Sequence, residues 1–211
     1  MQQHRFTRAQ YEQMVHAGVL APDDRLELLD GEIIDVAPQK SRHATAVSLV
    51  GEALRSTLPE GGHIRAQLAF NLDERSQPEP DIAVVPGLPR DYRDAHPGRA
   101  LLIVEVADRT LSWDRGRKLA TYVGAGVPEY WILDLNGEAL EVCRAPLGDD
   151  DVQRFVLRGA DRVATLHARR RNRGRGGLVV LMIRRGRTVA EGTGAPGFHL
   201  RAHRLEVELR S

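Results

Sequence analysis

Apolar and polar residues recur along the chain with periods that predict a mixture of helices and strands. Near the N-terminus, Thr7 precedes a segment that carries Tyr11, Met14 and Val15 at helical spacing. Threonine is a preferred helix N-cap, because its side-chain oxygen accepts a hydrogen bond from a free backbone N–H group. The pattern therefore predicts a short capped helix over residues 6–17.

A β-hairpin is predicted directly after this helix. Asp30-Gly31 lies between two apolar runs, residues 25–29 and 32–36, and Pro38 follows the second run. Glycine adopts positive φ without strain, so an Asp-Gly pair between two such runs favours a tight turn. Pro38 is expected to end the second strand.

A second helix and three strands are predicted next. Apolar residues at spacings of three and four, from Val47 to Leu58, predict a helix over residues 43–58 with Ser41 as its cap. Three strand-like segments follow, at residues 64–72, 81–85 and 100–107. The last two are nearly continuous aliphatic runs, which are typical of strands buried on both faces.

The pattern then predicts a third helix and a second hairpin. Ser112 and Asp114 can each cap a helix that ends near Gly124. Asn136-Gly137 is a strong turn signal, and it separates a predicted strand over residues 130–135 from another over residues 139–144.

The predicted order of elements is α–β–β–α–β–β–β–α–β–β, which indicates a mixed α/β protein built on a central sheet. With 211 residues, the chain is expected to form one domain with an appendage. We expect the main domain over residues 1–165. Residues 166–211 begin with an Arg/Gly-rich segment, 168–177, and end with a short closing segment near 196–205, and further strands are expected at 153–157 and 178–183.

Composition argues against a membrane-spanning, secreted or disulfide-bonded protein. No apolar run is long enough to span a membrane, and the N-terminus lacks the apolar stretch of a signal peptide. The single cysteine, Cys143, excludes an intramolecular disulfide and a cysteine-cluster metal site, so we expect a cytoplasmic protein. Charge is uneven: residues 1–157 hold 17 Lys and Arg against 25 Asp and Glu, whereas residues 158–211 hold 13 Arg against 4 acids.

Two carboxylates stand in strands where a charge is costly to bury. Asp81 opens the run DIAVV, and Glu105 lies within LLIVEVA. A carboxylate inside a buried strand needs a partner, a shifted pKa or a metal ion. Two of them on neighbouring strands can converge on one Mg²⁺ ion, which takes oxygen ligands from one or two carboxylates together with phosphate and water.

Three further residues are candidates, each with a plainer alternative. Lys118 lies one turn after Asp114 and could orient a water or neutralise phosphate charge, but the two could instead form a surface ion pair worth about 0.3–0.5 kcal/mol. Glu27 could join the acidic site or be an ordinary outward-facing strand charge. His43 could approach a phosphate from a helix N-terminus or lie on the surface.

Other sites are disfavoured. His199 and His203 have the spacing of a zinc helix, but no third ligand or nearby glutamate accompanies them. The chain has no Gly-rich phosphate loop and no G-x-S-x-G motif, and Cys143 has no credible base for acyl transfer.

Four segments in this order resemble a known family: PEPD at 78–81, LLIVEVAD at 101–108, the D-x-x-x-K of Asp114 to Lys118, and GVPEYWILD at 126–134. ELLDGEIIDVAP at 27–38 extends the resemblance toward the N-terminus. Together they resemble the restriction-endonuclease-like proteins of a widespread family within the PD-(D/E)XK nuclease superfamily.

The resemblance implies a restriction-endonuclease-like mixed central sheet flanked by helices, with an N-terminal hairpin. It implies Asp81, Glu105 and the carbonyl of Val106 as ligands of Mg²⁺ or Mn²⁺, with Lys118 and Glu27 as further catalytic residues. In the superfamily the lysine usually lies two residues after the second acid, where this chain has Ala107. Lys118 on the next helix is taken as its replacement.

The function implied by the resemblance is metal-dependent hydrolysis of DNA phosphodiester bonds, leaving a 5′-phosphate. The partner is then a nucleic acid, expected to be DNA, and a homodimer is expected by analogy alone. Two alternatives stay open: a catalytically inactive nuclease-fold protein that binds nucleic acid or regulates, and a different α/β enzyme acting on a small phosphorylated molecule. Because residues 1–157 are acidic overall, the Arg-rich tail could supply phosphate contacts.

Overall fold

The fold is known from a computed structural model that describes residues 3–21, 23–55, 58, 61–144, 152–158 and 163. For four short strand segments near the C-terminus it describes the backbone alone: β9 (Leu178–Val179), β10 (Met182–Gly186), β11 (Gly197–Arg201) and β12 (Arg204–Leu205). Among these, β10 pairs with β11 and β9 with β12, both antiparallel. The Arg/Gly-rich segment 168–177 lies outside the described residues, and the domain boundary at 165 stays a prediction.

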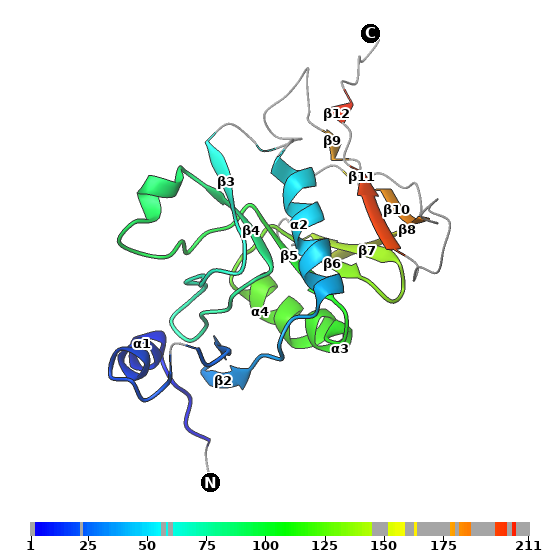
Figure 1. The fold of residues 1–211 in the computed structure, drawn as a ribbon. Coiled ribbons are helices and arrows are strands. Elements are labelled where there is room, and N and C mark those ends of the chain that lie inside the picture. The colour runs from blue at the N-terminus through cyan, green and yellow to red at the C-terminus, as the bar shows by residue number, and fades with distance from the viewer. Residues whose placement is uncertain are drawn as a thin grey trace.

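A six-stranded mixed sheet forms the centre of the molecule (Figure 1). Its strands lie in the order β3 (Gly62–Arg65), β4 (Ile82–Pro86), β5 (Leu102–Ala107), β6 (Glu129–Asp134), β7 (Ala139–Arg144) and β8 (Gln153–Arg158). Strands β5 and β6 are parallel, and every other neighbouring pair is antiparallel. The predicted mixed central sheet is therefore confirmed.

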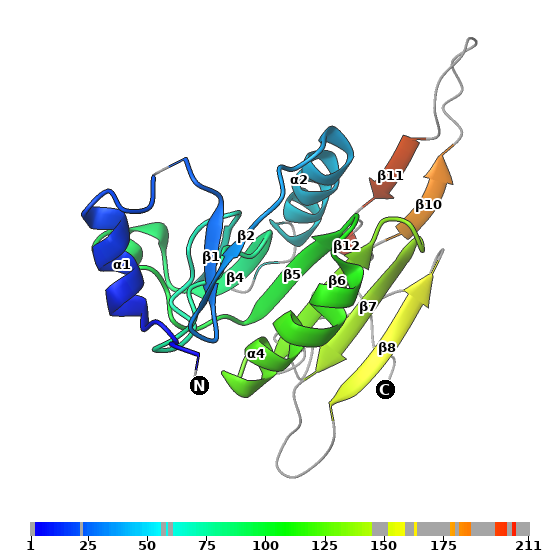
Figure 2. The same cartoon turned by 90° about the horizontal axis from the view of Figure 1, so that it is seen from below.

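Helices cover both faces of this sheet (Figure 2). Helix α2 (Ser41–Arg55) packs on one face through Val47, Val50 and Leu54, against Val104 and other side chains of the central strands. The opposite face is covered by α3 (Leu111–Trp113), a π-helical turn η2 (Asp114–Lys118) and α4 (Leu119–Gly124). Strand β5 is buried along its whole length, as its aliphatic run predicts.

The N-terminal elements also match the sequence pattern. Helix α1 (Arg8–His16) starts after Thr7, whose hydroxyl accepts the Gln10 N–H while the Gln10 side chain accepts the Thr7 N–H. Strands β1 (Leu26–Leu29) and β2 (Glu32–Asp35) form an antiparallel hairpin around Asp30 and Gly31, which have φ values of 50° and 77°. These values are those of the tight hairpin turn that Asp-Gly favours.

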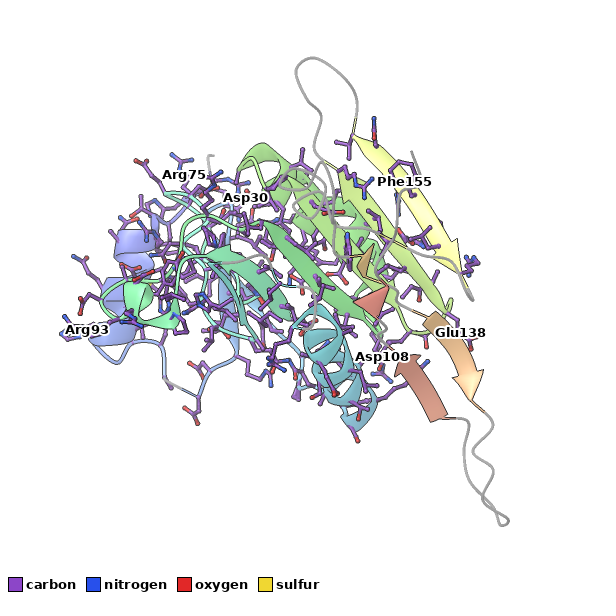
Figure 3. All side chains as sticks on the ribbon, turned by 90° about the horizontal axis from the view of Figure 1, so that it is seen from above. Asp30, Arg75, Arg93, Asp108, Glu138 and Phe155 are labelled. Atoms are coloured by element: carbon purple, nitrogen blue, oxygen red, sulfur yellow. The ribbon has the colours of Figure 1, made fainter. Side chains whose placement is uncertain are left out.

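The hairpin is fixed to the segment that precedes Asp81. The Asp30 N–H donates to the Ser76 hydroxyl (3.1 Å), and the Gly31 N–H donates to the Arg75 carbonyl (2.7 Å). Asp30 and Arg75 lie side by side in Figure 3. This places β1, and with it Glu27, against the segment that leads into β4.

One predicted strand is wrong over most of its length. Strand β3 ends at Arg65, not at residue 72. Gln67 has a positive φ of 53°, which turns the chain out of the extended conformation. The segment that follows runs beside Pro78 and Pro80, which have no N–H group and so cannot continue a ladder of paired strands.

Three local predictions are also corrected. The third helix begins at Leu111 after Thr110, so Ser112 and Asp114 lie within the helical segment and do not cap it. Helix α2 begins at Ser41 itself, two residues before the predicted start. In the β6–β7 hairpin the left-handed residue is Glu138 (φ 50°), because the Asp134 carboxylate accepts the N–H groups of the predicted turn residues and shapes a longer turn.

Two further details complete the comparison. In place of one strand over 178–183, the backbone forms the separate segments β9 and β10. Over the residues that the structure describes, no helix is both long enough and apolar enough to cross a bilayer.

Candidate active site

Asp81 and Glu105 face each other on adjacent strands. Strand β4 pairs with β5 so that Ile82 lies opposite Val104 and Ala83 opposite Ile103. One step further along, this register places Asp81 directly opposite Glu105. Directly opposite residues share a face of the sheet, so both carboxylates point toward α4. Both are buried, with 7% and 4% exposure.

Three groups hold the Asp81 carboxylate. The Val106 backbone N–H donates to Oδ2 (2.8 Å), and His43 Nε2 lies 3.1 Å from the same oxygen. The Gln67 side-chain amide donates to Oδ1 (3.3 Å). Asp81 is therefore fixed by the neighbouring strand, by the start of α2 and by the segment after β3.

Glu105 accepts two hydrogen bonds on one oxygen. The Lys118 ammonium group and the Tyr122 hydroxyl each donate to Oε1 at 2.9 Å. The other oxygen, Oε2, lies on the Asp81 side, 3.5 Å from the Asp81 N–H. Burial raises the pKa of Glu105 to about 8; the Lys118 charge opposes this shift, and the nearby carboxylates reinforce it.

A π-helical turn brings Lys118 into the site. The Leu119 N–H donates to the Asp114 carbonyl five residues earlier, which widens the helix at this point. Asp114 and Lys118 are both buried within it, with 2% and 8% exposure. The alternative of a surface ion pair is therefore wrong. Such local π-helical turns occur frequently at functional sites.

The charges around Lys118 keep its amine protonated. Burial by itself lowers the pKa of Lys118, but the carboxylates of Glu105, Glu27 and Asp114 outweigh burial and raise it above its ordinary value. Asp114 lies in the same buried cluster and accepts a hydrogen bond from the Thr110 hydroxyl (2.5 Å). Burial raises its pKa, which the charge of Lys118 opposes.

Glu27 also belongs to this cluster. Its Oε2 lies 3.5 Å from Lys118 Nζ, and the residue is 4% exposed, so the alternative of an outward-facing charge is wrong. The hairpin is fastened to the lysine-bearing helix by Arg117, which pairs with Glu32 (2.6 Å) and donates to the Leu29 carbonyl (2.8 Å). This clamp sets how far Glu27 reaches toward Lys118.

The structure adds three residues to those that the sequence predicts as catalytic. His43 lies against Asp81, and within the described residues its Nδ1 is buried without a hydrogen-bond partner. Burial lowers the pKa of His43, but the hydrogen bond and charge of Asp81, the Val106 backbone and the Asp108 charge together raise it. Gln67 and Tyr122 complete the contacts to the two carboxylates.

Comparison with known proteins identifies the family. The Uma2 family, described as "putative restriction endonuclease", matches residues 8–168. The chain belongs to the Uma2 family. That match covers the sheet, the hairpin and every residue of the site.

A solved structure supports the same fold. A crystal structure from Anabaena variabilis, titled a putative nuclease belonging to DUF820, is 16% identical and has a TM-score of 0.55. The alignment covers 71% of this chain and 84% of that one. No curated protein matches the chain. The Uma2 chain therefore has the restriction-endonuclease-like fold that its sequence resembles.

The composition of the site fits a divalent cation bound by oxygen. Three buried carboxyl groups, of Glu27, Glu105 and Asp114, act on one ammonium group, and the buried Asp81 carboxylate lies next to Glu105. Uncompensated buried charge is costly. The described residues contain no group of three or more His, Cys, Asp and Glu side chains arranged to hold a metal. Two carboxylates are nevertheless enough for Mg²⁺, which keeps several waters.

The backbone of Val106 lies beside the Asp81 carboxylate. Its N–H points toward Asp81, and in an extended strand the C=O of a residue points to the same side as its N–H. The carbonyl that the resemblance implies as a ligand is therefore directed toward the Asp81 side of β5.

Proposed function

We propose that this Uma2-family chain is a nuclease that uses a divalent metal ion to hydrolyse phosphodiester bonds in DNA. The observation that carries the proposal is the meeting of Asp81 and Glu105, from adjoining strands, with the buried Lys118 ammonium group beside them. Asp81, Glu105 and the Val106 carbonyl would hold Mg²⁺ or Mn²⁺. When bound there, such an ion lowers the pKa of a water and offsets phosphate charge.

Neighbouring side chains and backbone groups orient the carboxylates of Asp81 and Glu105. Val106, His43 and Gln67 fix Asp81, so its carboxylate presents a defined edge to the site. Tyr122 and Lys118 occupy one oxygen of Glu105 and direct the other toward Asp81. Preorganisation of this kind removes the cost of reorienting the ligands during the reaction.

Lys118 supplies the positive charge of the site. Its ammonium group is held by Glu105 and Glu27, and it stays protonated at neutral pH. A cation at this depth can stabilise the charge that develops on the phosphate oxygens, or orient the attacking water. Overall, one water adds across the P–O3′ bond: the phosphate keeps the water oxygen, the 3′ oxygen takes a proton, and a 5′-phosphate results.

The test is cleavage by the intact chain of supercoiled plasmid, linear duplex, single-stranded DNA and RNA, each with Mg²⁺, Mn²⁺ or EDTA. Cleavage with the metals and none in EDTA is expected. Asp81→Asn and Glu105→Gln should each lower the rate by about 10²–10³-fold, the cost of removing one preorganised electrostatic contact.

The matched control is Glu52→Gln, an exposed acid on α2, which should cleave like the parent chain. Thermal unfolding confirms that each variant is folded. Cleavage that persists in Asp81→Asn or Glu105→Gln would contradict the assignment. Salt-sensitive DNA binding without cleavage under any condition would favour the binding-only alternative.

A further inference from the structure

We propose that the sheet edge beside the site is a binding track for the phosphodiester backbone of the substrate, centred on Arg65. This inference rests on the proposed function and deepens it, because it names the chemistry that the protein contacts next to the reacting bond. The track consists of His63, Arg65 and Gln67 on and just after β3, with Tyr92 and His96 from the segment after β4.

His63 and Arg65 on β3 point to the same face of the sheet as the site. His63 pairs with Val85 and Arg65 pairs with Ala83, on the face of β4 that also carries Asp81. Gln67 lies beyond the end of β3, and its amide donates directly to Asp81 Oδ1 (3.3 Å). Alternate residues of an extended strand lie about 6.6 Å apart, so His63 and Arg65 place two nitrogen-bearing side chains about that far apart along β3. Two such side chains, with the Gln67 amide beside them, can contact more than one phosphate group, which suits an extended polymer.

Arg65 is held in place but has no acidic partner. Its guanidinium group lies 6.0 Å from the centroid of the Tyr92 ring, and its Nη2 donates to His96 Nδ1 (3.0 Å). Within the described residues it pairs with no carboxylate, and its buried Nε has no hydrogen-bond partner. The guanidinium group of Arg65 therefore keeps hydrogen-bonding capacity that the described residues do not use.

Several other arginines of the described residues do have a carboxylate within ion-pair distance, among them Arg5, Arg42, Arg115, Arg117, Arg144 and Arg154. Arg65 thus presents a guanidinium group that is already oriented by an aromatic ring. A guanidinium fork matches phosphate oxygens, and the charge-assisted hydrogen bonds it makes with them are strong.

The local charge favours an anionic partner. Residues 61–72 and 86–100 together hold four arginines and two histidines against two aspartates. Residues 1–157 as a whole carry a net charge of −8. The short helix η1 (Pro89–Tyr92) lies beside β3, since the Tyr92 ring packs on His63. Arg93, just after η1, lies at the opposite end of the molecule from Phe155 on β8 (Figure 3). The track is therefore a basic edge within a region, residues 1–157, that is acidic overall.

The test is fluorescence anisotropy of a labelled DNA duplex, and of an RNA duplex of the same sequence, with the intact chain in EDTA at several salt concentrations. Arg65→Gln should weaken binding about tenfold. It should also reduce the slope of log K against log salt by about 0.9, the contribution of one phosphate contact. Arg65→Lys keeps the charge, so it should keep the slope while binding more weakly than the parent chain.

The control is Arg55→Gln, which removes an exposed arginine of α2, on the opposite face of the sheet, and should change neither quantity. Binding of either polymer supports the track, and the tighter one identifies the substrate class. The inference is overturned if the parent chain binds neither polymer, if Arg65→Gln keeps both affinity and slope, or if Arg65→Lys binds like the parent.

The two proposals can fail separately. Cleavage by the parent chain, with affinity unaffected by Arg65→Gln, leaves the proposed function standing and removes the track. Arg65-dependent binding without cleavage removes the proposed function and leaves the track.

Discussion

Replacing Lys118 by methionine tests whether this amine compensates the buried acids. The substitution keeps the length and most of the volume of the side chain but removes its charge. Glu27, Glu105 and Asp114 would then lie together without the ammonium group, which now lies 2.9 Å from Glu105 and 3.5 Å from Glu27. Breaking a buried ion pair by removing one partner costs about 3–5 kcal/mol.

For a chain of this length, 1 kcal/mol lowers the melting temperature by about 2–4 °C, so Lys118→Met should melt about 6–20 °C lower. The assays are thermal unfolding, for the melting temperature, and urea unfolding, for the free energy, both in EDTA at pH 8 and at pH 5.5. The loss should be smaller at pH 5.5, because a protonated Glu105 carboxyl group no longer needs a cation. Adding Glu105→Gln to Lys118→Met should restore part of the stability, and the double-mutant cycle gives the coupling energy.

The chain offers a matched control, because its only other lysine, Lys40, is exposed. Lys40→Met should change the unfolding free energy by less than about 0.5 kcal/mol. If Lys118→Met were as stable as Lys40→Met at pH 8, Lys118 would not be the counter-ion of the buried acids, and its assigned place in the mechanism would lose its basis.

Three further predictions follow from the same contacts. The pKa of Glu105 is about 8 in the folded protein, against an ordinary value of 4.5 for a glutamate in water, so the native state holds a proton that the unfolded state releases. The free energy of unfolding in EDTA should therefore fall as pH rises from 5 to 8, by up to about 1.4 kcal/mol per pH unit. The fall should be steeper in the parent chain than in Glu105→Gln. Equal slopes of unfolding free energy against pH in the two proteins would refute this prediction. Mn²⁺ at one hundred times its dissociation constant should stabilise the fold by about 2.7 kcal/mol in calorimetric melting; an equal gain in Asp81→Asn would place the ion elsewhere. Gly31→Ala should destabilise the chain by about 1–3 kcal/mol more than Gly18→Ala. Both glycines have positive φ, but only at Gly31 would the new Cβ lie 2.7 Å from Arg5 Cβ. Equal urea midpoints of the two variants would contradict this prediction.

The two central acids could be predicted from the sequence because the aliphatic residues around them indicate that their strands are buried. Asp81 directly precedes one aliphatic run and Glu105 interrupts another, and strands buried on both faces do not tolerate an unpaired charge. That reasoning needs no knowledge of the partner strands. The structure adds the register, which puts the two residues opposite each other on one face.

The sequence left both a buried and a surface position possible for Lys118 and for Glu27, because their burial depends on contacts with residues far away in the sequence. The helical spacing of Asp114 and Lys118 fits a surface pair as well as a buried one. The π-helical turn that buries both has no sequence signature in the pattern of apolar residues. Glu27 is buried because the hairpin is paired, through Glu32, with Arg117 of η2, far along the chain.

His43, Gln67 and Tyr122 show where sequence reasoning ends. His43 is a candidate with an equally ordinary surface interpretation, and only the placement of α2 brings it to Asp81. Gln67 reaches Asp81 because the predicted strand stops early, at a residue with positive φ. Tyr122 looks like an apolar core residue, and it is one, but its hydroxyl also binds Glu105.

The measurement that tests the central claim most directly is a crystal structure of the protein soaked in Mn²⁺, with anomalous scattering used to locate the ion. The account predicts an anomalous peak bridging the Asp81 and Glu105 carboxylates, at about the 2.0–2.2 Å expected for oxygen ligands of a small divalent cation. Density for ordered Asp81 and Glu105 side chains with no peak between them, or a peak only at another place, would contradict it.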